Sequence, residues 1–223
     1  MEGIYTAHRA AAPLYLDALR AVRALYEADI RRGGMTAPYL REVRDALQGV
    51  DEAAPTPPQP TARAACQHLD VALMLARRGA LEALGRALLP LAGHLAWQAC
   101  PTYDPTEVGE RFDRAYAYAE LLGATGTVDR EGVVVGILLL APHTHYPAHA
   151  HPAAEVYHVL AGTACWRHGR SPWVRRPPGA RLLHPPHTPH AMHTEAEPLL
   201  ALYAWSGEVA TPSHMVAPPS AHA

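Results

Sequence analysis

Two histidines, a glutamate and a tyrosine stand close together at a spacing that could hold a metal ion. His149 and His151 are two residues apart, Glu155 follows four residues later, and Tyr157 comes two residues after that. Residues two apart on a strand project to the same face, and these four positions share one parity. Burying two imidazoles, a carboxylate and a phenol together without partners would cost several kcal/mol. A divalent cation removes that cost, so the spacing predicts a metal site.

The fourth ligand is expected from a neighbouring strand, at His190. Ten of the 15 histidines lie between residues 143 and 193, and metal coordination is the commonest reason for such clustering. Three histidines and one glutamate suit iron, manganese, cobalt, nickel or zinc, so we expect one divalent transition metal ion whose identity stays open. The other histidines of this region are expected at the surface or behind the ligands, namely His143, His145, His158, His168, His184, His187 and His193.

The first half of the chain has the pattern of helices. Apolar residues recur at helical spacing in three stretches, at residues 14–29, 37–47 and 61–89. Asp104, followed by Pro105 and by Glu107 three residues after the cap, predicts a further helix that runs to about Leu122. We expect this helical half to contribute no metal ligand and at most a cover over the mouth of the domain that follows.

Beyond residue 126 the pattern changes to that of strands. The apolar run from Gly132 to Leu140 predicts a buried strand. Further short strands, separated by Gly or Pro, are predicted at residues 155–160, 163–168, 180–184 and 199–205. Short strands with repeated turn signals favour an all-β barrel or double-sheet jelly roll. The chain is therefore expected to be α+β, with an N-terminal helical region at 1–125, a β-barrel at 126–211 and a loose tail at 212–223.

The two histidine-rich segments together resemble the paired motifs of the cupins. The matching positions are His149, His151, Glu155 and Gly162 in the first motif and Gly179, Pro185 and His190 in the second. His143 and His187 stand where these motifs have glycine, and Thr194 stands where asparagine is common. None of these three departures falls on a ligand position. The resemblance implies a cupin barrel with one metal ion bound by His149, His151, Glu155 and His190.

The residues around these motifs resemble those of the cupin-type dimethylsulfoniopropionate (DMSP) lyases. The likeness covers roughly residues 106–205 and includes Tyr146 before the histidines and Tyr157 after the glutamate. It implies a carbon–sulfur lyase that forms dimethyl sulfide and acrylate by β-elimination. Tyr157 is the candidate base, since a nearby dication favours the phenolate, and Tyr146 is expected to position the substrate or tune that proton. The candidate aromatic wall for the sulfonium consists of Trp166, Tyr203 and Trp205.

Two other functions are left open by these residues. A cupin dioxygenase or isomerase acting on another small carboxylate would use the same four ligands, and Tyr157 would then be incidental. A non-catalytic metal-binding cupin would bind or sense a small molecule. Acrylate formation without oxygen consumption separates the lyase from the dioxygenase, and any turnover excludes the non-catalytic function.

Composition limits the other partners. The formal net charge of −2 gives no reason to expect nucleic acid or an anionic membrane surface, and no apolar stretch is long enough to span a bilayer. We expect a cytoplasmic protein that binds a small sulfonium carboxylate. Cupins often pair through their barrels, so a homodimer is compatible with the sequence, which leaves the oligomeric state open. The three cysteines have no CxxC spacing and are expected to be small buried residues, at positions 66, 100 and 165.

Overall fold

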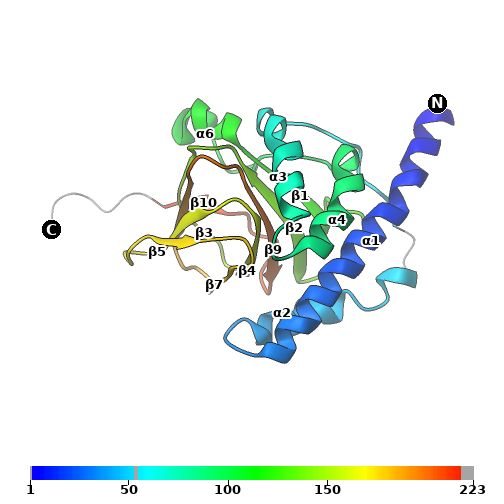
Figure 1. Ribbon diagram of the computed structural model, residues 1–223, viewed down its shortest axis with the longest axis horizontal. Coiled ribbons are helices and arrows are strands. Elements are labelled where there is room, and N and C mark those ends of the chain that lie inside the picture. The colour runs from blue at the N-terminus through cyan, green and yellow to red at the C-terminus, as the bar shows by residue number, and fades with distance from the viewer. Residues whose placement is uncertain (1, 53–54, 217–223) are drawn as a thin grey trace.

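The computed structural model describes residues 2–52 and 55–216, in which the helices of the first hundred residues pack on one side of two β-sheets and a shorter helical segment lies over one end of them (Figure 1). The helices are α1 (Glu2–Arg32), α2 (Ala37–Ala46), α3 (Leu69–Ala76), α4 (Glu82–Leu88), α5 (Pro105–Val108) and α6 (Glu110–Ala115), with short 3₁₀ helices η1 (Val50–Glu52), η2 (Ala64–His68) and η3 (Leu89–His94). The strands are β1 (Tyr116–Leu122), β2 (Val133–Leu140), β3 (His145–Ala150), β4 (Ala154–Ala161), β5 (Ala164–His168), β6 (Val174–Arg176), β7 (Arg181–His184), β8 (His190–Thr194), β9 (Leu199–Ser206) and β10 (His214–Met215).

The strands form two five-stranded sheets. The first sheet has the order β1-β2-β9-β4-β7 and the second has the order β10-β3-β8-β5-β6. Neighbouring strands run antiparallel, and the chain passes between the two sheets where β3 leads into β4. The expected α+β chain with a C-terminal cupin barrel is confirmed. No helix of the described residues combines the length and the apolar composition needed to cross a bilayer.

Strand β2 has a continuous apolar sequence because both of its faces are buried. Val135, Ile137 and Leu139 belong to a core shared with the helices, whereas Val134 and Leu138 belong to the core inside the barrel. Both faces of the strand are therefore covered, so every position favours an apolar side chain. The buried strand predicted here is confirmed.

Helices α1, α2 and α3 cover the outer face of the first sheet. Leu19 and Val22 of α1 and Leu40 of α2 pack in the same core as the outward residues of β2 and β9. The helical half was expected at most to cover the mouth of the barrel, and this part of the prediction is wrong. An amphipathic helix buries its apolar face against the largest apolar surface available, which here is the back of the sheet.

A buried polar contact also joins α1 to the first sheet. Nε2 of His158 lies 2.6 Å from Oδ2 of Asp29, and Nη1 of Arg181 lies 3.4 Å from the same oxygen. His158 is 1% exposed and follows Tyr157, so it faces the helices while Tyr157 faces the interior. The surface or supporting position expected for His158 is therefore wrong. Its partner is a helix carboxylate on the side of the sheet away from the site.

The helix expected from Asp104 to Leu122 begins as predicted but ends early. Oδ1 of Asp104 accepts a hydrogen bond from the backbone N–H of Thr106 at 2.8 Å, as a helix cap does. Gly109, at φ +86°, ends α5 after one turn. The chain then forms the short α6 and enters β1 at Tyr116, where large residues alternate with alanine at the period of a strand. The first strand of the sheet thus precedes residue 126, and the proposed domain boundaries stay a prediction.

The tail expected to be loose is ordered as far as residue 216. Strand β10 pairs with β3 through His214 and Met215, and Ser213 is buried. Oη of Tyr103 donates a hydrogen bond to Oγ of Ser213 at 2.8 Å. Residues 217–223 lie outside the described part of the chain. Pairing to a sheet edge outweighs the proline content that suggested a loose segment.

Candidate metal centre and active site

The expected ligands converge from both sheets of the barrel. His149 lies on β3 and His190 begins β8, and these two residues face each other in the register of the second sheet. Glu155 lies on β4 of the first sheet, and His151 lies in the short connection between β3 and β4. The shared parity of residues 149, 151 and 155 predicted that they lie on one continuous strand. The structure reaches the same convergence through a change of sheet at Pro152.

Three of the four expected ligands form a compact group. Nε2 of His151 and Nε2 of His190 each lie 3.2 Å from Oε2 of Glu155. All three side chains are buried, and one ligand atom of each lies within 4.8 Å of the others. Among residues 2–52 and 55–216 this is the one group of its kind, and the helical half contributes nothing to it. His68 and His94 do not belong to this group, and the side chain of His8 lies outside the described residues.

The hydrogen bonds of these histidines leave a free lone pair on each ring. The Nδ1 atoms each lie 2.9 Å from a backbone carbonyl oxygen, in the pairs His149 with Pro147, His151 with Ala153 and His190 with Thr188. A carbonyl only accepts, so Nδ1 carries the proton of the neutral ring and Nε2 carries the lone pair. Nε2 of His190 is buried without a hydrogen bond from the described residues. Two lone pairs thus meet a carboxylate oxygen with no proton between them, and this arrangement fits a cation.

His149 lies beside this group and is not a member of it. Its ring stacks on Tyr146, with centroids 4.0 Å apart and planes at 8°, and its centroid lies 4.1 Å from that of His190. Burial, together with the nearby His190, holds the pKa of His149 well below its ordinary value, so the ring is neutral. His149 as the fourth ligand stays a prediction. Behind the group, His184 stacks on His190 at 3.9 Å, in the supporting position expected for it.

Trp205 orients the carboxylate of the group. Trp205 on β9 pairs with Glu155 on β4, and its Nε1 donates a hydrogen bond to Oε1 of Glu155 at 2.7 Å. Oε2 of this carboxylate therefore remains free to face the two histidines.

Replacing Trp205 with phenylalanine should weaken metal binding while preserving the fold. Phenylalanine keeps an aromatic ring in the barrel but removes the donor that orients Glu155, and loss of such a supporting contact typically lowers metal affinity by about 10- to 100-fold. Competition with a chromogenic chelator measures the affinity. Trp97→Phe is the matched control, since Trp97 is buried among the helices and its Nε1 has no partner in the described chain. Equal affinities of the two variants would contradict the prediction.

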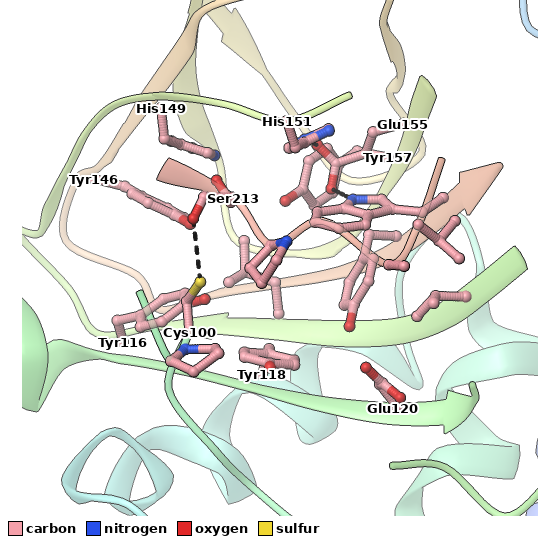
Figure 2. Close-up of a pocket in the computed structure, with 18 residues that line it drawn as sticks. Cys100, Tyr116, Tyr118, Glu120, Tyr146, His149, His151, Glu155, Tyr157 and Ser213 are labelled. Carbon is pink, nitrogen blue, oxygen red and sulfur yellow. Dashed lines mark hydrogen bonds and ion pairs between the residues drawn. The ribbon is translucent and has the colours of Figure 1, made fainter. Parts of the chain in front are cut away.

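A small cavity of about 160 Å³ opens beside the metal-ligand group. Its walls carry five tyrosines, Tyr116, Tyr118, Tyr146, Tyr157 and Tyr203. Figure 2 shows His149, His151, Glu155 and Tyr157 along one side of this cavity, and Cys100, Tyr116, Tyr118 and Glu120 along the other. Burial first, and then the charge of Glu155, raise the pKa of Tyr157 well above its ordinary value. The chain alone therefore keeps this phenol protonated.

Tyr146 belongs to a chain of hydroxyl groups. Its Oη lies 2.8 Å from Oη of Tyr103, which in turn donates to Oγ of Ser213. Tyr103 and Ser213 were not foreseen, because they come from a loop before the barrel and from the segment expected to be loose. Tyr103 and Ser213 lie far apart in the sequence, and the pairing of β10 with β3 brings Ser213 next to the barrel.

The aromatic wall differs in part from the one expected. Tyr203 and Trp205 line the cavity, but Trp166 is 1% exposed and is not among the lining residues. Its ring packs against Tyr157 with centroids 4.9 Å apart, so Trp166 fixes the position of that tyrosine from the second sheet. Tyr116 and Tyr118 take its place on the wall, and they were missed because their segment was expected to be helical. Cys100 is buried as predicted and also lines the cavity, where burial raises the pKa of its thiol.

Comparison with known proteins gives one consistent family. The family model described as dimethylsulfoniopropionate lyase matches residues 40–201. DddL of Cereibacter sphaeroides is 33% identical over 201 residues, which cover 87% of this chain and 83% of the relative. The dimethylsulfoniopropionate lyase DddQ of Ruegeria pomeroyi is 33% identical over 110 residues, which cover 49% of this chain and 55% of the relative.

Solved structures agree with this result. A chain from the crystal structures of the DMSP lyases RdDddP and RnDddQII superposes with a TM-score of 0.70 at 26% identity, covering 94% of this chain and all of that one. The crystal structure of DddQ from Ruegeria pomeroyi shares the fold, with a TM-score of 0.68 at 24% identity over 91% of this chain and 98% of the other. By sequence over most of its length, and by fold, the chain belongs to the DMSP lyase family.

Proposed function

We propose that this protein is a metal-dependent DMSP lyase that uses Tyr157 as the base of a β-elimination. The observation that carries the proposal is the position of Tyr157, whose phenol lines the same small cavity as His151 and Glu155. Membership of the DMSP lyase family supports the substrate, and the converging lone pairs of the histidines support a metal ion. His151, Glu155 and His190 would hold it, with His149 as the fourth ligand.

The reaction requires three chemical functions from the site. One is a base that removes the proton from the carbon next to the carboxylate. Another is stabilisation of the charge that develops on the carboxylate, and the last is a surface for the departing dimethyl sulfide. When bound to this group, a divalent cation supplies a Lewis acid for the carboxylate and favours the phenolate of Tyr157.

Tyr157 is well placed for the proton transfer. It lies two residues after Glu155 on β4 and faces the cavity, while Trp166 packs against its ring from the second sheet. The proton passes from the α-carbon of the substrate to Oη of Tyr157. The electron pair of that C–H bond then forms the double bond of acrylate, and the C–S bond breaks to release neutral dimethyl sulfide. A base whose ring is already held by packing loses little freedom on reaction.

Tyr146 has a different role in this proposal. Its hydroxyl already interacts with Tyr103, so it is held in place on the side of the cavity next to His149. From there it positions the substrate and exchanges protons through the chain of hydroxyls that ends at Ser213. Tyr203 and Trp205 offer aromatic faces, which attract a sulfonium through their quadrupoles.

Release of dimethyl sulfide is the direct test of this function. The metal-reconstituted protein, incubated with DMSP, should form dimethyl sulfide and acrylate in equal amounts, both in air and under strict exclusion of oxygen. Headspace gas chromatography and liquid chromatography measure the two products. Product formation that requires oxygen would favour a cupin dioxygenase instead, and no turnover of DMSP by fully reconstituted protein would refute the proposal.

A further inference from the structure

Glu120 places a negative charge on the wall of the cavity opposite the metal-ligand group. Tyr116, Tyr118 and Glu120 alternate along β1, and all three line the cavity. Figure 2 shows Glu120 on the same side as Tyr118 and away from His149 and His151. The mechanism proposed above uses the other carboxylate of the cavity, Glu155, and leaves Glu120 without a function.

The register of the first sheet connects Glu120 to the proposed base. Glu120 pairs with Gly136, Gly136 with Tyr203, and Tyr203 with Tyr157, so the four residues form one row across β1, β2, β9 and β4. Neighbouring strands lie about 4.8 Å apart, and inward side chains converge inside a barrel. The row therefore places the carboxylate and the base at opposite ends of a single interior surface.

The ring of Tyr203 fills the middle of this row because residue 136 is glycine. A Cβ atom at position 136 would lie 2.5 Å from Oη and 2.6 Å from Cε1 of Tyr203, which is closer than atoms can approach. The tyrosine thus lies over the glycine, and its hydroxyl end reaches toward β1. A continuous aromatic surface then runs from Tyr157 to the side chain of Glu120.

No basic group neutralises Glu120 in the described part of the chain. Oε2 of Glu120 accepts a hydrogen bond from the backbone N–H of Thr125 at 2.9 Å, and no arginine lines the cavity. The charge of Glu120 acts on the neighbouring phenols: burial first, and then Glu120, raise the pKa values of Tyr118 and Tyr203. Phenolates are thereby disfavoured at this end of the cavity, and a cation is favoured.

We propose that Glu120 selects the positive charge of the substrate. A sulfonium has no N–H or O–H to donate, so only aromatic faces and a nearby negative charge can distinguish it from a neutral group of the same shape. With the substrate carboxylate at the metal-ligand group, the cationic end points along the Tyr203 surface toward Glu120. The inference rests on the proposed function and adds the residue that recognises the cationic end of the substrate.

Two probes of equal shape test this selection without turnover. The 3-(trimethylammonio)propionate ion carries a positive charge, and 4,4-dimethylpentanoate replaces that nitrogen with carbon. Both keep the carboxylate, and neither has a sulfide leaving group. Dissociation constants for the metal-loaded protein come from isothermal titration calorimetry. The wild-type protein should bind the charged probe more tightly.

Glu120→Gln should remove most of that preference. We expect the dissociation constant of the charged probe to rise by about five- to tenfold, because Glu120 is only partly buried and solvent screens its charge. The dissociation constant of the neutral probe should stay within about twofold. Glutamine has nearly the same shape and keeps an oxygen for the Thr125 N–H. Glu131→Gln is the matched control, since Glu131 is exposed, does not line the cavity, and its replacement changes the net charge equally.

The outcomes separate this inference from the proposed function. An equal change for both probes would mean that Glu120 acts through shape, and unchanged constants for both would mean that it does not act at all; either result overturns the inference. A wild-type protein that binds the two probes equally would also overturn it. Charge selection that is lost in Glu120→Gln, in a protein that releases no dimethyl sulfide, would support the role of Glu120 while refuting the lyase.

Discussion

Replacing Tyr157 with phenylalanine should lower the rate of acrylate release by roughly 10²- to 10⁴-fold, the usual effect of removing a general base. Phenylalanine keeps the ring that packs against Trp166 and Tyr203 and removes only the hydroxyl. The fold and the metal content should therefore stay unchanged, and circular dichroism and elemental analysis verify both. Acrylate measured by liquid chromatography gives the rate.

Two further variants make this result specific. Tyr26→Phe removes a phenol that is buried on α1, does not line the cavity and has no partner in the described residues, so it should keep full activity. Tyr146→Phe should reduce activity less than Tyr157→Phe if Tyr146 only positions the substrate, and comparably if the two phenols share the proton. Activity of Tyr157→Phe within about threefold of wild type would exclude the tyrosine mechanism. It would also remove a principal reason for choosing elimination over other cupin chemistry.

The double variant His151→Ala, His190→Ala should lose its metal and its activity together. These rings supply the two lone pairs that face Oε2 of Glu155, and without them only Glu155 and His149 remain of the four expected ligands. We expect about one metal ion per wild-type chain, less than about a tenth of that in the variant, and no detectable dimethyl sulfide. Elemental analysis by mass spectrometry after dialysis measures the occupancy.

A matched histidine pair controls for the number of imidazoles removed. The variant His68→Ala, His94→Ala changes two histidines of the helical half, neither of which belongs to the metal-ligand group. It should keep its metal content. Full occupancy in the His151, His190 double variant would show that the ion binds elsewhere and would refute the assignment.

The motif spacing predicted the site well, because the position of a side chain on a strand depends on local geometry. His151, Glu155 and His190 meet as expected, even though the chain changes sheets between the first two. The place of Trp166 was not predictable in the same way. Whether a ring lines a cavity or packs behind Tyr157 depends on which sheet carries β5, and no local pattern in the sequence encodes that arrangement.

The largest error in the fold prediction concerned residues 116–122, and it had a physical cause. A good cap at Asp104 made the helix that follows convincing, and alanine-rich segments favour helices in isolation. The alternation from Tyr116 to Glu120 is the signal that was outweighed, and in the structure the pairing of β1 with β2 decides the outcome. Glu120 was missed for this reason, because a residue on an expected helix has no assigned place inside the barrel.

The two histidines that replace glycine in the cupin motifs keep the left-handed backbone of a glycine turn. His143 has φ +53° and His187 has φ +59°, a region in which glycine is favoured and other residues are strained. The turns that these motifs require are therefore kept, although the residues that usually make them are not. Histidine at positions 143 and 187 therefore adds backbone strain at the two turns without moving the ligand positions.

One wall of the cavity, from Val209 to Ser213, comes from the last described part of the chain, while the metal-ligand group lies on β3, β4 and β8 or between them. This wall is held by the two-residue strand β10 and by the contact between Tyr103 and Ser213. Substitutions and changes of length are tolerated more readily in such a segment than in a central strand. Substitutions in residues 209–213 would therefore change which molecules fit the cavity and leave the chemistry of the inner strands unchanged.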